Sequence, residues 1–228
     1  MTGPFRRAAR VAPMAKPRTP AGRAKRARAL LAEEYPETVC PLHHENAYQL
    51  LTATILSAQT TDERVNMVTP ALFARYPTPE NLAGARHAEV EGLIKSTGFF
   101  RSKSRSIIGM AQALVERFDG QVPSRIEDLV TIPGVGRKTA NVVRHVVFDE
   151  PGFPVDTHVG RLCRRLGLTT EVDPVKVEHE LNAMVPAAER GKFSLRLIFH
   201  GRAVCAARKP RCEVCLLNDF CPSAFADR

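Results

Sequence analysis

Two residues in the second half of the chain have types and spacing that could support covalent chemistry. Lys138 stands in "TIPGVGRKTANVV", residues 131–143, and Asp156 follows in "PVDTHVGRLCRRLGL". A lysine attacks carbon only as the uncharged amine, and a cation in the first turn of a helix is electrostatically disfavoured. A nearby carboxylate can stabilise a cationic intermediate. The pair therefore suits a nucleophile and its supporting acid. A solvated or phosphate-contacting lysine and an N-capping aspartate are the open alternatives.

The glycine turn before Lys138 does not have a nucleotide-binding pattern. "GVGRKT" lacks the Gly-x4-Gly-Lys spacing of a P-loop, and no strand precedes it. The flanking apolar residues indicate helix, tight turn, helix. Gly134 and Gly136, with Val135 between them, would expose backbone N–H groups beside a helix N-terminus, where a phosphate binds without sequence readout. A simple connector is the alternative.

Four of the six cysteines lie close together near the C-terminus. The segment "CAARKPRCEVCLLNDFC" spaces Cys205, Cys212, Cys215 and Cys221 as C-x6-C-x2-C-x5-C. An array of single cysteines favours an iron–sulfur cluster. Zinc, which usually takes two close pairs, and disulfides, which rarely persist inside cells, stay open. Cys40 and Cys163 are expected to be ordinary buried thiols.

The elements that must position these residues are predicted to be helices throughout. Apolar residues recur at helical spacing over 47–58, 107–118 and 155–166, and no stretch alternates with the period of a strand. Proline and glycine punctuate the chain into roughly ten short helices. We therefore predict an all-α fold, with the segment "FDEPGFPVD" (148–156) as the hinge between two helical regions.

The positive charge of the chain is concentrated at its N-terminus. The formal net charge is +9, and the first 30 residues hold nine Lys/Arg and no acid, so the remainder is balanced. We predict a basic disordered tail over residues 1–26 that raises encounter rates with polyanions, or that serves solubility alone. The longest apolar runs are too short to span a bilayer, and no secretory signal is seen.

Four segments in this order resemble endonuclease III, the bacterial bifunctional DNA glycosylase family of the helix-hairpin-helix superfamily. They are "SAQTTD" (57–62), "LVTIPGVGRKTANVV" (129–143), "VDTHVGRL" (155–162) and the four-cysteine array. The resemblance implies two helical domains with DNA bound in the cleft between them. One would be a six-helix barrel with the helix-hairpin-helix (40–150). The other would be an iron–sulfur cluster domain formed by 27–39 and 151–228.

The resemblance also implies roles for individual residues. Lys138 would be the nucleophile and Asp156 its essential carboxylate. Gln59 would fill the gap left by a flipped base, and Asp62 would line the lesion pocket. The loop at 96–104 would insert a wedge, and here it departs from the commonest bacterial form by offering Phe99 and Phe100.

The expected cofactor is a [4Fe–4S] cluster, and the expected DNA contacts come from two further places. The four C-terminal cysteines would hold the cluster. The DNA backbone would be gripped by the glycine turn with Arg137, and by the basic loop that the cysteines enclose, which carries Arg208, Lys209 and Arg211.

The implied function is removal of oxidised pyrimidines from duplex DNA through a lysine Schiff base, followed by β-elimination 3′ to the site. Partners would be double-stranded DNA with damaged pyrimidines or abasic sites, met by a monomer at the nucleoid of the bacterial cytoplasm, with no membrane. A monofunctional adenine-mismatch glycosylase would lack Lys138. A non-catalytic helix-hairpin-helix module would need Gly134 and Gly136 but neither Lys138 nor Asp156.

Overall fold

The computed structural model describes residues 16–226, and regular structure there is entirely helical. This confirms the predicted all-α class. The α-helices in chain order are α1 (Pro20–Glu34), α2 (Ala47–Leu56), α3 (Asp62–Arg75), α4 (Pro79–Ala83), α5 (His87–Ile94), α6 (Phe100–Phe118), α7 (Ile126–Leu129), α8 (Arg137–Phe148), α9 (Thr157–Arg165), α10 (Pro174–Met184) and α11 (Arg190–Ala203). Short 3-10 turns occupy Lys95–Thr97, Ala187–Glu189 and Cys212–Val214.

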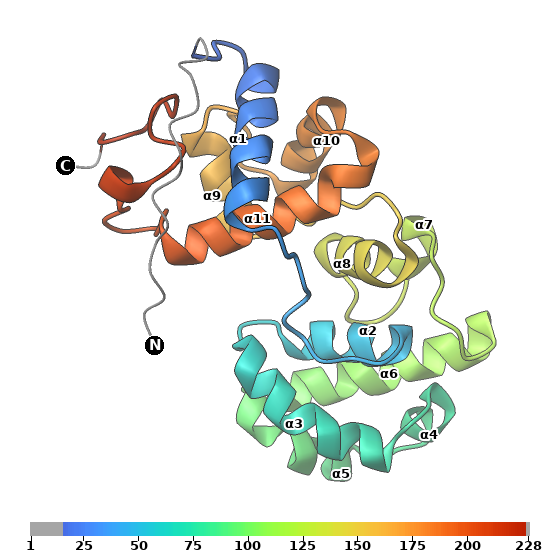
Figure 1. Cartoon of the computed structure of the whole chain (residues 1–228). Helices are drawn as coiled ribbons and strands as arrows, with labels where there is room; N and C mark the ends of the chain where they lie inside the picture. Colours follow the sequence, from blue (N-terminus) through green and yellow to red (C-terminus); the bar gives the residue numbers. More distant parts are fainter. Residues whose placement is uncertain (1–15, 227–228) are drawn as a thin grey trace.

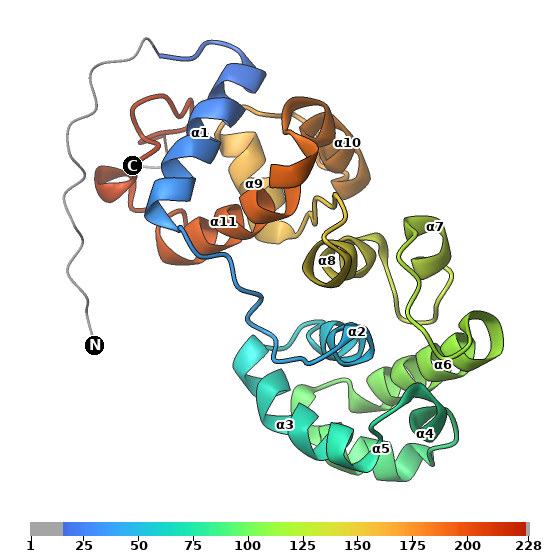
Figure 2. The same cartoon turned by 45° about the vertical axis from the view of Figure 1, so that its right-hand side comes forward.

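The helices form two lobes (Figure 1). One lobe holds α2 to α6, with α7 and α8 on the side that faces the other lobe, which holds α1, α9, α10 and α11 with the C-terminal segment (Figure 2). The chain crosses between the lobes twice, after α1 and after α8. The N-terminal helix therefore packs with the C-terminal third of the chain, against α10 and α11.

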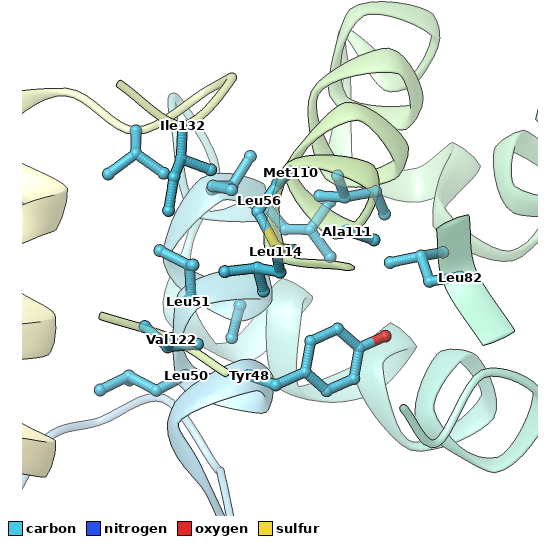
Figure 3. Close-up of a cluster of buried hydrophobic side chains, with 14 of the residues drawn as sticks. Tyr48, Leu50, Leu51, Leu56, Leu82, Met110, Ala111, Leu114, Val122 and Ile132 are labelled. Atoms are coloured by element: carbon cyan, nitrogen blue, oxygen red, sulfur yellow. The ribbon is translucent and has the colours of Figure 1, made fainter. Parts of the chain in front are cut away.

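Each lobe has its own apolar core. The first core gathers buried residues between Leu42 and Val143, and Figure 3 shows its centre, where Leu51, Met110 and Leu114 meet. Ile132, from the turn before α8, belongs to the same core, so the turn is anchored to α2 and α6. The second core joins Ala24, Ala27 and Leu31 of α1 to residues between Phe153 and Phe220. The second core already includes Ala24, which precedes the predicted limit at residue 27, and the predicted domains of 27–39 with 151–228 and 40–150 stay a prediction.

The predicted disordered tail extends too far. Residues 1–15 lie outside the described residues, but α1 begins at Pro20 after the N-cap Thr19, whose hydroxyl accepts from the Gly22 amide at 3.1 Å. Residues 20–26 are thus helical. Ala24, Ala27 and Leu31 lie on one face of α1 and pack into the second core. The basic residues between them made this apolar face hard to recognise in the sequence.

The basic residues of α1 also serve the fold. Arg26 pairs with Asp219 and lies over the Phe220 ring, and Arg28 pairs with Glu189 at 2.6 Å. These positive charges fasten α1 to the C-terminal half of the chain. They are therefore less free for a polyanion than the sequence indicated.

The segment 148–156 connects the lobes as expected, and its residues pack closely against both of them. Phe153 is fully buried and meets Phe193 edge to face, with ring centroids 6.1 Å apart. Ser194 donates to the Pro154 carbonyl oxygen. A Cβ on Gly152 would lie 2.6 Å from the Asn141 carbonyl oxygen, so the connection also passes tightly against α8.

None of the helices within residues 16–226 is both long and apolar enough to cross a membrane.

Candidate active site

Lys138 and Asp156 line the same cavity, although they belong to different lobes. The cavity has a volume of about 90 Å³ and lies among α2, α8 and α11. Lys138 is exposed in the first turn of α8, and Asp156 is the N-cap of α9. Asp62, at the start of α3, lines the cavity as well. The structure thus brings together three residues that the sequence marked separately.

Asp156 fulfils the capping role and still has a free oxygen. Its Oδ1 accepts from the Val159 amide at 2.8 Å, which fixes the carboxylate at the helix N-terminus. Oδ2 has no hydrogen-bond partner in the part of the chain that the structure describes. The structural and functional interpretations of this aspartate are therefore compatible.

The turn before α8 is shaped by its glycines. Gly134 has φ +79°, and a Cβ there would lie 2.8 Å from the Ser106 Cβ, so only glycine fits. Gly136 is the N-cap of α8 and offers no side chain to the first N–H groups of the helix. Both glycines are exposed. This leaves backbone donors at a helix N-terminus, as the phosphate hypothesis requires.

Val135 departs from the expectation for this turn. Its side chain is buried in the first core, and its amide donates to the Ile132 carbonyl oxygen at 3.0 Å. The apolar side chain anchors the turn and the amide closes it. The structure therefore does not support Val135 as a donor to DNA.

Arg137 is also engaged within the protein. Its Nε and Nη2 donate to Glu178 Oε2 and Oε1, at 2.7 and 2.9 Å. This ion pair joins α8 to α10 across the lobes. The hydrogen bonds that Arg137 donates to Glu178 raise the pKa of Arg137 further, so the guanidinium stays charged. Glu178 carried no recognisable signal in the sequence, because its partner lies 41 residues away.

Asp62 lies in an ion pair of its own. Arg202 of α11 donates from Nη1 to Asp62 Oδ2 at 3.0 Å, and both residues line the cavity. Sequence reasoning missed Arg202, which is 140 residues from its partner. The pair places opposite charges side by side at the cavity wall, where they can recognise polar groups of a bound molecule.

Two further residues of the cavity were not expected there. Burial lowers the pKa of His145, and the charge of Asp149 acts in the opposite sense. The imidazole ring packs directly over Gly191, since a Cβ added to that glycine would lie 2.0 Å from the Cγ of His145. Cys40 is only half buried and lines the cavity, so the expectation of an ordinary buried thiol is wrong for it. Burial raises the pKa of its thiol. Cys163 is fully buried, as expected, which raises its pKa to about 12.

Gln59, expected to fill the gap left by a flipped base, and Phe99 of the expected wedge loop both stand on exposed turns. Gln59, after α2, has φ +53°, and Phe99, before α6, has φ +46° and is 68% exposed. Phe100 turns inward and packs against the first core. Of the two phenylalanines, Phe99 is therefore the one available to a partner.

The four C-terminal cysteines come close together at the end of the second lobe. All six cysteines of the chain are free thiols. Burial raises the pKa of Cys215 to about 11, and the other three thiols add to this effect. Arg165 donates to Cys205 Sγ at 3.4 Å, and His200 Nε2 lies 3.3 Å from Cys215 Sγ. Within residues 16–226, no three His, Cys, Asp or Glu side chains are arranged so that they could hold a single metal ion.

The loop between Cys205 and Cys212 is braced from α9. Arg165 donates to the carbonyl oxygens of Ala206 and Ala207, at 2.7 and 3.0 Å. Arg208, Lys209 and Arg211 are exposed, as expected of DNA contacts. Arg211 also donates to the Ala203 carbonyl oxygen, so part of its hydrogen-bonding capacity holds the loop.

Comparison with known proteins identifies the class. Residues 52–187 match the sequence model of the HhH-GPD superfamily of base excision DNA repair proteins. Residues 205–221, which begin and end with an array cysteine, match the iron–sulfur binding domain of endonuclease III.

Proteins named endonuclease III are similar in sequence to this chain along most of its length. Endonuclease III of Synechocystis is 54% identical over 86% of this chain and 90% of its own, and that of Bacillus subtilis is 42% identical over 84% and 88%. A non-covalent endonuclease III–DNA complex superposes with a TM-score of 0.85 at 38% identity, covering 90% of this chain and 96% of that one. A trapped endonuclease III–DNA covalent intermediate gives 0.86 at the same identity and coverage. The chain belongs to the endonuclease III family.

The family carries a [4Fe–4S] cluster, and the residues present fit that group. The donor set is four thiols that influence one another electrostatically, with Arg165 directed at one sulfur. A cluster bound by thiolates would suit both the thiol-rich donor set and the cationic neighbour. The match over residues 205–221 decides between a cluster and zinc in favour of the cluster.

Proposed function

We propose that this protein is a bifunctional DNA glycosylase of base excision repair that removes oxidised pyrimidines and then cleaves the abasic strand. The observation that carries the proposal is the shared cavity of Lys138, Asp156 and Asp62. An amine, a carboxylate with a free oxygen and a polar pocket wall are the groups that a Schiff-base glycosylase needs. The names of the relatives, including the trapped covalent DNA complex, support the same reaction.

In the proposed reaction, the neutral amine of Lys138 attacks C1′ of a nucleotide that has left the base stack, and the base departs. The Schiff base that results acidifies the C2′ proton, and β-elimination cleaves the strand on the 3′ side. Asp156, held by its cap to Val159, stabilises the developing positive charge through the free oxygen and assists proton transfer.

The DNA would be held on both lobes at once. The amides of Gly134 and Gly136 on the first lobe would contact phosphates, and so would the exposed Arg208 and Lys209 on the second. Gln59 and Phe99 would enter the duplex and compensate for the lost stacking, which costs a few kcal/mol when a base is extruded. Asp62 with Arg202 would face the extruded base.

The cysteines Cys205, Cys212, Cys215 and Cys221 would hold the cluster, whose contribution is to fold and fix the basic loop between the first two. We further propose that the protein acts as a monomer at the nucleoid of a bacterial cell. Size-exclusion chromatography coupled to light scattering tests the monomer.

The decisive experiment is borohydride trapping on a duplex with one abasic site. Wild type should form a covalent adduct, and Lys138→Ala should form none. Lys176→Ala, which removes an exposed lysine of α10 far along the chain, is the matched control and should form the adduct at the wild-type rate.

Three outcomes separate the alternatives. An adduct that depends on Lys138 assigns the lyase, and a thymine-glycol duplex then tests the base specificity. Excision of adenine opposite 8-oxoguanine without an adduct would indicate the monofunctional mismatch glycosylase. Binding without excision of either base would leave a helix-hairpin-helix binding module.

A further inference from the structure

The two exposed turns that carry Gln59 and Phe99 have strained backbones. Both residues adopt positive φ, +53° and +46°, which is uncommon outside glycine and most unusual for a bulky side chain. Such conformations persist only where the surrounding structure determines them. The contacts that hold these two turns therefore determine where the side chains of Gln59 and Phe99 lie.

One buried lysine connects both turns. Lys103 lies in the first part of α6 and is 5% exposed. Its Nζ donates to Thr60 Oγ1 at 2.6 Å and to the Thr97 carbonyl oxygen at 2.8 Å. The Thr60 hydroxyl donates to the same carbonyl oxygen. Thr60 follows Gln59 directly, and Thr97 lies two residues before Phe99, so the network ties the two turns to each other and to α6.

The Thr97 side chain completes the network from the other end. Its Oγ1 donates to the Ile94 carbonyl oxygen at 2.8 Å, which fixes the last turn of α5 to the same point. Three helices thus bear on the position of the two turns: α2 through its following turn, α5 through Ile94, and α6 through Lys103.

A buried lysine contributes less to the stability of the fold than an apolar side chain in the same place would. Burial lowers the pKa of Lys103, and the ammonium has no carboxylate partner among residues 16–226. An apolar side chain of similar length would fill the space without the desolvation of a charge. What an apolar chain would lose is the pair of hydrogen bonds through which α6 holds Thr60 and Thr97 together. The network is therefore better explained by the geometry that it imposes.

We propose that Lys103 is a positioning residue for base extrusion, which fixes Gln59 and Phe99 relative to each other so that they enter the duplex as a pair. The inference rests on the proposed function, since it concerns the step that delivers a stacked nucleotide to Lys138. Lys103 does not line the cavity, and in the proposal it takes no part in the bond changes at C1′.

A positioning role predicts a selective defect. Where the lesion is paired, both side chains must replace stacking and pairing, so their relative placement controls the rate of extrusion. Where the opposite base is missing, extrusion costs less, and the placement matters less. The chemical step at Lys138 is the same in both cases.

The test uses single-turnover excision of thymine glycol by the cluster-loaded protein, with two duplexes. In one the lesion faces adenine, and in the other it faces a tetrahydrofuran abasic analogue. Lys103→Met should lower the paired rate about tenfold, the effect of about 1.4 kcal/mol on a barrier, and the unpaired rate by no more than about twofold. Lys95→Met, an exposed lysine of the neighbouring 3-10 turn, is the matched control and should leave both rates unchanged.

Equal losses on the two duplexes, or no loss on either, would overturn the proposal. If Lys103→Met does not fold, as judged by circular dichroism and the cluster absorbance, Thr60→Val replaces it, because valine keeps the shape and removes the shared hydroxyl. The same selective loss is expected. If the wild type is inactive on both duplexes, the proposed function itself is contradicted. If the wild type is active but the variant loses activity equally on both duplexes, only the positioning role of Lys103 is contradicted.

Discussion

Arg137→Ala distinguishes a structural role of the residue beside Lys138 from a DNA contact. In the structure the guanidinium donates twice to Glu178, whose side chain is only 6% exposed, while the arginine side chain is 37% exposed. Removal of the arginine leaves a buried carboxylate without its partner. The substitution should therefore destabilise the fold, independently of any effect on DNA.

The magnitude follows from the exposure of the two partners. Loss of one partner from a fully buried pair costs about 3–5 kcal/mol, and an exposed pair contributes about 0–1 kcal/mol. Because the arginine is partly open to solvent, we expect about 2–3 kcal/mol. For a chain of this size, 1 kcal/mol corresponds to about 2–4 °C, so the melting temperature should fall by about 4–12 °C.

The assay is thermal and urea unfolding followed by circular dichroism, with salt titrations of DNA binding alongside. Glu178→Gln keeps the shape of the acceptor and removes its charge, and it should cost less than Arg137→Ala. The reasoning is refuted if Arg137→Ala unfolds like wild type while its plot of log affinity against log salt becomes shallower by about one unit. That result would assign the arginine to a phosphate.

Three further perturbations have expected outcomes. Gly191→Ala should destabilise the protein, since its Cβ would meet the His145 ring, and the added change His145→Ala should recover most of the loss in urea unfolding. Folding lowers the pKa of His145, so the unfolded chain binds more protons than the folded chain once the pH is below the ordinary histidine pKa of about 6.5. The stability that comes from the neutral ring is therefore present above that pH and is lost as the pH falls. His145→Asn should flatten the acid limb of a stability–pH profile. Deletion of residues 1–15, which removes three arginines, should weaken DNA binding mainly at low salt and flatten the salt slope by up to about 3, and an unchanged slope would assign the segment to solubility.

The helical class and the candidate nucleophile could be predicted from the sequence because their signals are local. The apolar spacing over 107–118 lies on α6, and the glycines at 134 and 136 form the turn that they indicated. Helix ends were less predictable. Ala58 continues the apolar spacing of α2, yet that helix ends at Leu56 and Ala58 is exposed, because the chain turns there through Gln59 at φ +53°.

The interactions that complete the site are long-range and left no pattern in the sequence. Arg202 and Asp62, Arg137 and Glu178, and Lys103 with its two threonine contacts each join segments that only the fold brings together. A charged residue on an amphipathic helix has the same local pattern whether it faces solvent or a distant partner. Sequence reasoning therefore interpreted Arg137 as a DNA contact, where the fold gives it a buried carboxylate.

The placement of these ion pairs explains how a site shared by two lobes keeps its geometry. Lys138 follows a turn anchored in the first core, and Asp156 caps a helix packed in the second, so their separation depends on how the lobes meet. Two ion pairs bridge the lobes near the cavity: Arg137 of α8 with Glu178 of α10, and Asp62 of α3 with Arg202 of α11. A misplacement of 1 Å between reacting groups can cost about a hundredfold in rate. If Lys138 and Asp156 react together as proposed, the bridging charges would act on catalysis through the lobe arrangement that they hold.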